Sequence, residues 1–215
     1  GLAGGGAELV VAGLLLLLGL EGTRIPVIDF LLEPRANLLL DLLDLREAPR
    51  LHFSDMVLRH IPGTQDPLKA DTPWFLLLEW SSSRPKADGA EGMSDKMEQF
   101  LADQLETGRV LDAVIAQNEA QARNMWVIRE SVAPASRAEG PGLSYDISVS
   151  ISKIPAFIEK GVQAAFDILP SIRPYPLGHI GDGNLHFSFM GPKGMDRETL
   201  KQYSPAITRA VNDLV

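Results

Sequence analysis

The stretch "PLGHIGDGNLHFSF" (residues 176–189) holds two histidines, seven positions apart, around a Gly-Asp-Gly-Asn core. Asp-Gly between two strand-like segments predicts a β-hairpin with a two-residue type I′ turn at Asp182 and Gly183. In that register His179 lies directly opposite His186, with Cβ atoms about 5 Å apart. Because side chains alternate between the two faces of a strand, four residues are expected to share one face: His179, Gly181, Asn184 and His186.

The opposite face of this hairpin is apolar, since Ile180, Leu185 and Phe187 can pack on a core. Two imidazoles on the polar face can reach one metal ion, but catalytic zinc takes three protein ligands and the hairpin offers two. Without a metal, one neutral histidine can act as a general base. A surface hairpin with two unrelated histidines is the alternative reading. A glycine at position 181 leaves room for a ligand to approach the backbone.

Outside the hairpin the chain alternates between strand and helix patterns. Strands are predicted from Trp74, at 109–116 and at 143–151. Helices are predicted over four segments that show helical spacing of apolar residues: 94–108, 117–133, 154–169 and 196–215. Asp196 is the expected N-cap of the last helix, and Pro134 is expected to end the second. The order predicts an α+β fold of ferredoxin-like type, with an antiparallel or mixed sheet and helices packed on one face.

Composition limits the classes of partner. The 215 residues are 45% hydrophobic and 22% charged, with a net charge of −8 and no cysteine. A net negative charge disfavours nucleic acid and anionic membrane surfaces. The absence of cysteine excludes disulfides, thiolate metal sites and a cysteine nucleophile. We expect a cytoplasmic protein, with a peripheral membrane or organellar location left open.

Residues 1–50 are rich in leucine and have no evident role. The apolar run 9–20 is twelve residues long, short of the roughly 20 that cross a bilayer. It is therefore expected to form a buried helix or strand pair. We predict a division into this N-terminal segment and a domain over 51–215, and expect the chain to be truncated because it stops inside a predicted helix.

The stretch "GHIGDGNLHF" resembles the Gly-His-x-Gly-Asp-Gly-Asn-x-His motif of FAD-linked 2-hydroxyacid dehydrogenases, in their C-terminal domain. That family includes D-lactate dehydrogenase, the glycolate oxidase flavin subunit and D-2-hydroxyglutarate dehydrogenase. Further stretches agree in order and spacing, so that the resemblance covers roughly residues 51–215: 57–68, 73–82, 113–131 and 145–158.

The resemblance implies that this chain is the substrate domain, with FAD held mainly by a flavin domain of the same polypeptide. It implies that His179 and His186 are catalytic metal ligands, with a divalent metal such as zinc as a candidate cofactor. A third ligand would then lie beyond Val215. Arg129 and Ser188 would bind a small 2-hydroxy acid, and Asn184 and Gly181 would face the flavin. A homodimer is left open.

Three positions depart from the 2-hydroxyglutarate enzymes of the family. Ala133 stands where they have threonine, Ser144 where they have lysine, and Ser188 where they have asparagine. The resemblance thus implies oxidation of a small D-2-hydroxy acid to the 2-oxo acid, of the lactate, glycolate or 2-hydroxyglutarate class, and these departures favour a monoacid. A stand-alone module that binds a metal or small acid without redox activity is the main alternative, and a structural domain is another.

Overall fold

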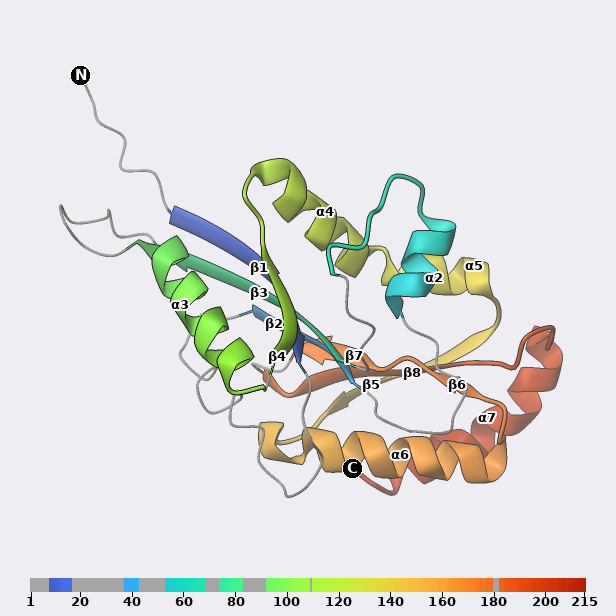
Figure 1. Ribbon diagram of the computed structural model, residues 1–215. Helices are drawn as coiled ribbons and strands as arrows, with labels where there is room; N and C mark the ends of the chain where they lie inside the picture. The colour runs from blue at the N-terminus through green and yellow to red at the C-terminus, as the bar shows by residue number, and fades with distance from the viewer. Residues whose placement is uncertain are drawn as a thin grey trace.

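The computed structural model describes residues 8–16, 37–42, 53–68, 74–82, 92–108, 110–179 and 182–215 (Figure 1). Its helices and strands follow the chain in this order: β1 (Glu8–Leu16), β2 (Asn37–Leu42), α2 (Phe53–His60), β3 (Trp74–Ser82), α3 (Met93–Glu106), β4 (Val110–Ile115), α4 (Glu119–Glu130), α5 (Val132–Glu139), β5 (Gly142–Ser148), a 3₁₀ turn (Ile151–Lys153), α6 (Ile154–Ile168), β6 (Arg173–Pro174), β7 (Leu177–His179), β8 (Asn184–Met190) and α7 (Arg197–Asn212).

The strands form one antiparallel sheet in the order β4-β1-β3-β2-β7-β8-β5, and β6 pairs with β8 beside β7. This arrangement confirms the α+β class with an antiparallel sheet. The first 50 residues supply β1 and β2, which both pair with β3. The division of the chain at residue 50 stays a prediction.

One face of the sheet carries the main core. Leu185, Phe187 and Phe189 of β8 alternate with polar residues and belong, together with Ile147 of β5, to one core cluster that also contains buried residues of α3, α6 and α7. Helix α6 buries the residues that recur at helical spacing along its length: Ile154, Phe157, Ile158, Gly161, Val162 and Ala165. The ribbon shows α6 and α7 together below the sheet (Figure 1).

Gly161 sets the distance between α6 and the sheet. A Cβ atom at this position would lie 2.7 Å from Cζ of Phe187, so only glycine lets the ring sit against the helix backbone. The Phe187 ring also makes edge contacts with Phe157 and Phe189. Strand β8, which carries His186 on its other face, is therefore held in place by close packing.

Helices α2, α4 and α5 cover the opposite face (Figure 1). Met125 of α4 packs on Leu77 of β3. A second cluster joins α2, α4 and α5 to Tyr175 and Met190. The sequence suggested helices on one face only, and the structure adds this group on the other. The difference arises because central strands such as β3 are apolar on both faces, with Leu76, Leu77 and Leu78 all buried.

Most predicted elements are confirmed within a few residues, and the side chain of Asp196 caps α7 by accepting a hydrogen bond from the Thr199 amide. The prediction that Pro134 ends a helix is wrong. The helix breaks earlier, at Ser131, and Pro134 lies in the first turn of α5, where a missing amide hydrogen costs nothing. Among the described residues no helix is long and apolar enough to span a membrane.

Candidate functional site

The histidine hairpin has a different register from the predicted one. His179 pairs with Asn184 and Leu177 pairs with His186, so the two histidines are diagonal neighbours and the direct opposition is wrong. Gly183, immediately before β8, adopts a φ of 73°. The side chain of Asp182 accepts a hydrogen bond from the Asn184 amide at 3.0 Å and closes the turn.

The prediction that His179, Asn184 and His186 share one face is confirmed by the same pairing. The two imidazole rings lie 5.9 Å apart between centroids at an angle of 81°. Gly181 lies outside the described residues. The histidine face is the side of the sheet covered by α2, α4 and α5, opposite the main core.

Helix α4 brings a guanidinium to this face. Nη2 of Arg129 lies 2.9 Å from Nε2 of His179, across 50 residues of sequence. A guanidinium can only donate, so Nε2 of His179 is the acceptor and its ring is neutral. Burial, followed by the Arg129 charge, holds the pKa of His179 below its usual range, against the opposing effect of Asp182.

The second histidine has a carboxylate partner that the sequence did not reveal. Nδ1 of His186 lies 2.6 Å from Oδ1 of Asp146, its direct cross-strand neighbour on β5. Both side chains reach solvent, with 37% of His186 and 78% of Asp146 exposed. A partner 40 residues away cannot be read from local spacing.

Two polar atoms near the hairpin are buried without a hydrogen-bond partner among the described residues. They are Nε of Arg129, a donor, and Oδ1 of Asn184, an acceptor. Buried polar groups are nearly always paired in folded proteins. An unpaired donor and acceptor on one face are therefore what a site for a polar ligand would present.

A chain of hydroxyl groups borders the histidines. The Oγ atoms of Ser144 and Ser188 lie 2.8 Å apart on neighbouring strands. Burial raises the pKa of Tyr175, whose hydroxyl shares hydrogen bonds with Ser136 and Ser188. Ser188 is buried. These side chains are neutral at physiological pH, so this edge of the site carries no charge to bind a second carboxylate.

Glu139 fixes the helices above the sheet. Its carboxylate, with 6% of the side chain exposed, accepts hydrogen bonds from Arg59 at 2.8 Å and Arg173 at 2.9 Å, and lies 2.8 Å from Nε2 of His60. These contacts tie the C-terminal end of α5 to α2 and to β6. His60 therefore has a structural partner in Glu139.

The candidate metal ligands that the structure describes do not form a metal-binding site in their present arrangement. The Arg129 guanidinium occupies the lone pair of His179 that would face the metal. Within the described ranges, no three side chains of His, Cys, Asp or Glu gather into a ligand group. The structure does place the two imidazoles that were predicted as ligands on one face of the sheet.

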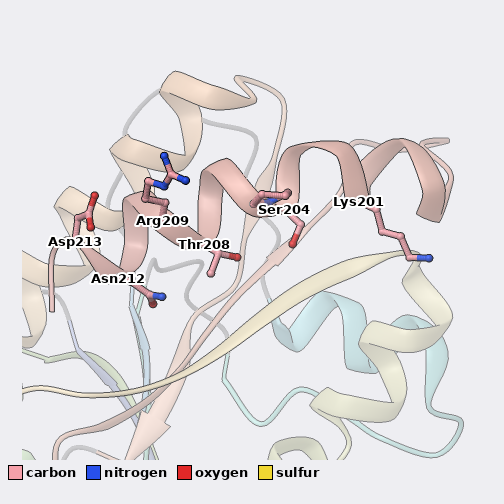
Figure 2. A pocket seen from close by; sticks show the side chains of 7 residues that line it. Lys201, Ser204, Thr208, Arg209, Asn212 and Asp213 are labelled. Atoms are coloured by element: carbon pink, nitrogen blue, oxygen red, sulfur yellow. The ribbon is translucent and has the colours of Figure 1, made fainter.

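A separate hollow of about 650 Å³ lies along α7, lined by the following residues (Figure 2): Lys201, Ser204, Pro205, Thr208, Arg209, Asn212 and Asp213. Thr208 is 3.2 Å from the hydroxyl of Tyr145, which points to the core side of the sheet. The sheet therefore separates this hollow from the histidines, and the hollow is not part of their site.

The fold and the site define an α+β domain that presents a histidine pair and an arginine on one face of an antiparallel sheet. Residues 46–214 match the family described as FAD linked oxidases, C-terminal domain. The chain belongs to this family.

Curated relatives agree with this assignment. A D-2-hydroxyglutarate dehydrogenase of Stutzerimonas stutzeri is 34% identical over 68% of this chain and 31% of its own length. A probable mitochondrial D-2-hydroxyglutarate dehydrogenase of Oryza sativa subsp. japonica is 32% identical over 73% of this chain and 26% of its own. A putative mitochondrial D-lactate dehydrogenase of Schizosaccharomyces pombe is 30% identical over 59% and 25%. The chain thus spans about a third or less of these relatives.

Proposed function

We propose that this chain is the substrate-binding domain of an FAD-dependent dehydrogenase that oxidises a small D-2-hydroxy acid to the 2-oxo acid. The observation that carries the proposal is Arg129, held by α4 beside His179, with its Nε buried and without a partner in the described part of the chain. The Nε and Nη2 edge of a guanidinium takes both oxygens of a carboxylate. Family membership and the names of the relatives support the redox assignment.

Each of these residues has a separate role in substrate binding. Arg129 holds the carboxylate of the acid and His186 accepts a hydrogen bond from its 2-hydroxyl. FAD, when bound, supplies the redox chemistry by accepting the hydride. Asn184, whose buried Oδ1 has no partner within the described ranges, can accept a hydrogen bond from a cofactor or substrate group. Helices α2, α4 and α5 cover part of this face, and His186 remains partly exposed to solvent.

Within this class we favour a monoacid over a diacid. The Ser144–Ser188 pair is neutral, whereas a second carboxylate needs a cation or several donors. The names of several relatives favour 2-hydroxyglutarate instead. A stand-alone module that binds a small acid without redox activity remains the second candidate, favoured by a site that this chain largely supplies by itself.

The complete FAD-containing protein tests this proposal. On anaerobic mixing, we expect D-lactate or glycolate to bleach the flavin absorbance faster than D-2-hydroxyglutarate. Ser144→Lys should then raise kcat/KM for D-2-hydroxyglutarate relative to D-lactate by about tenfold, because it adds an exposed cation beside Ser188. Ser171→Lys, the same change in an exposed turn, is the matched control. Binding of these acids without any bleaching would favour the non-redox module.

A metal ion is a further proposal that rests on the resemblance alone, and affinity measurements can decide it. Because Arg129 holds the His179 lone pair, Arg129→Ala should strengthen Zn²⁺ or Mn²⁺ binding by about tenfold, by freeing Nε2 and removing a positive charge. Isothermal titration calorimetry measures this change. Adding His179→Ala to that variant should abolish the gain. Equal affinity in wild type and Arg129→Ala would show that Arg129 does not obstruct a metal.

A further inference from the structure

The hydrogen bond between His186 and Asp146 decides which ring nitrogen His186 presents. An ionised carboxylate only accepts hydrogen bonds, so the nitrogen at 2.6 Å, Nδ1, carries the hydrogen. In the neutral ring the lone pair then lies on Nε2. No partner for Nε2 is found among the described residues.

Strand pairing, rather than a loop, holds this arrangement. Asp146 and His186 are direct partners in the β5–β8 ladder, and their side chains point to the same face. The two flanking pairs, Ser144 with Ser188 and Ser148 with Asn184, fix the register on both sides. The strand pairing therefore places the Asp146 carboxylate beside the His186 ring.

His179 cannot present its Nε2 to a ligand as an acceptor in the same way. Nε2 of His179 already accepts from the Arg129 guanidinium at 2.9 Å. Of the two imidazoles, which are 5.9 Å apart, that of His186 is the one whose acceptor nitrogen has no partner within the described ranges. Beside it, Nε of Arg129 is a buried donor without a partner among the described residues.

We propose that Asp146 is a positioning residue that fixes the ring orientation and tautomer of His186, so that Nε2 of this ring is presented as an acceptor beside the donors of Arg129. This inference rests on the proposed function and deepens it. A 2-hydroxy acid matches the arrangement, because it has a carboxylate that accepts and, on the adjacent carbon, a hydroxyl that donates. A 2-oxo acid lacks that donor, so the pair favours the alcohol over the ketone.

The tautomer of His186 can be observed directly in the ¹⁵N-labelled chain by long-range ¹H–¹⁵N correlation at mildly alkaline pH, where an ordinary imidazole is neutral. We expect wild-type His186 to carry its proton on Nδ1. Asp146→Asn keeps the shape, but an amide donates as well as accepts and no longer selects one tautomer. The ratio of Nδ1–H to Nε2–H should fall about fivefold, because the interaction energy of a solvent-exposed charge pair corresponds to an equilibrium factor of about this size. Asp146→Glu should restore most of it.

His60, which is bonded to Glu139 elsewhere, is the internal control and should keep its signals in every variant. An unchanged His186 tautomer in Asp146→Asn, with backbone spectra showing an intact fold, would overturn the proposal. So would a loss that Asp146→Glu fails to restore. The measurement needs neither flavin nor turnover, so it is independent of the proposed function. If the tautomer shifts as expected while no acid reduces the flavin, the positioning role stands and the dehydrogenase assignment fails.

Discussion

Arg129→Ala is expected to lower kcat/KM for every 2-hydroxy acid by about a hundredfold or more in the complete FAD-containing protein. The guanidinium is the charged donor on the histidine face that reaches His179, and its Nε is buried with no partner among the residues that the structure describes. Removing one partner of a desolvated charge pair costs about 2–5 kcal/mol, and each 1.4 kcal/mol is tenfold. Because the carboxylate is held in substrate and transition state alike, most of the loss should appear as a higher KM.

Arg123→Ala is the matched control for that measurement. Arg123 lies on the same helix, is exposed, and should leave steady-state kinetics unchanged. Arg129→Lys keeps the charge but loses the planar fork, so it should recover only part of the activity. Wild-type kinetics in Arg129→Ala would remove Arg129 from the site and with it the main support for the proposed substrate class.

Glu139→Gln is expected to lower the free energy of unfolding by about 3 kcal/mol, the usual cost of breaking a buried ion pair. The carboxylate is bonded to Arg173, which is itself buried, and to Arg59 and His60. The amide leaves the Arg173 charge without a counter-charge. Urea unfolding measures the loss. Glu159→Gln, an exposed change on α6, serves as the control and should stay within about 0.5 kcal/mol of wild type.

The same network predicts the direction of acid sensitivity. Burial acts to raise the pKa of Glu139, but hydrogen bonds from His60 and Arg173 and the charges of Arg59 and Arg173 outweigh it and lower the pKa below its ordinary value. A lowered folded-state pKa stabilises the fold above the ordinary glutamate pKa. The stabilisation is lost as the pH falls through the folded value. Glu139→Gln should flatten this part of the stability profile, and an unchanged slope would contradict the role of the network.

Helices and strands with a clear periodic pattern of apolar residues were predicted from the sequence. The periodicity of Phe157, Ile158 and Val162 marked α6, and the alternation of Leu185 and Phe187 marked the core face of β8. Helix α2 was missed because eight residues give too short a period to recognise. The histidine face was also predictable, since residues two apart on a strand share a face.

The contacts within the site were not predictable to the same degree. The Asp-Gly pair suggested a two-residue turn with His179 opposite His186, but His179 pairs with Asn184, whose amide donates to the Asp182 side chain. The partners Asp146 and Arg129 come from other strands and helices, 40 and 50 residues from the histidines they contact. Such partners depend on how the sheet and helices assemble, which spacing along the chain does not encode.

Strand β5 forms one outer strand of the sheet that the structure describes. Outer strands invite the addition of a strand from another molecule, and charged side chains on them discourage this form of aggregation. Asp146, with 78% of its side chain exposed, is such a charge. The carboxylate that orients His186 therefore also protects the chain against self-association, and a neutral residue at this position would weaken solubility together with the site.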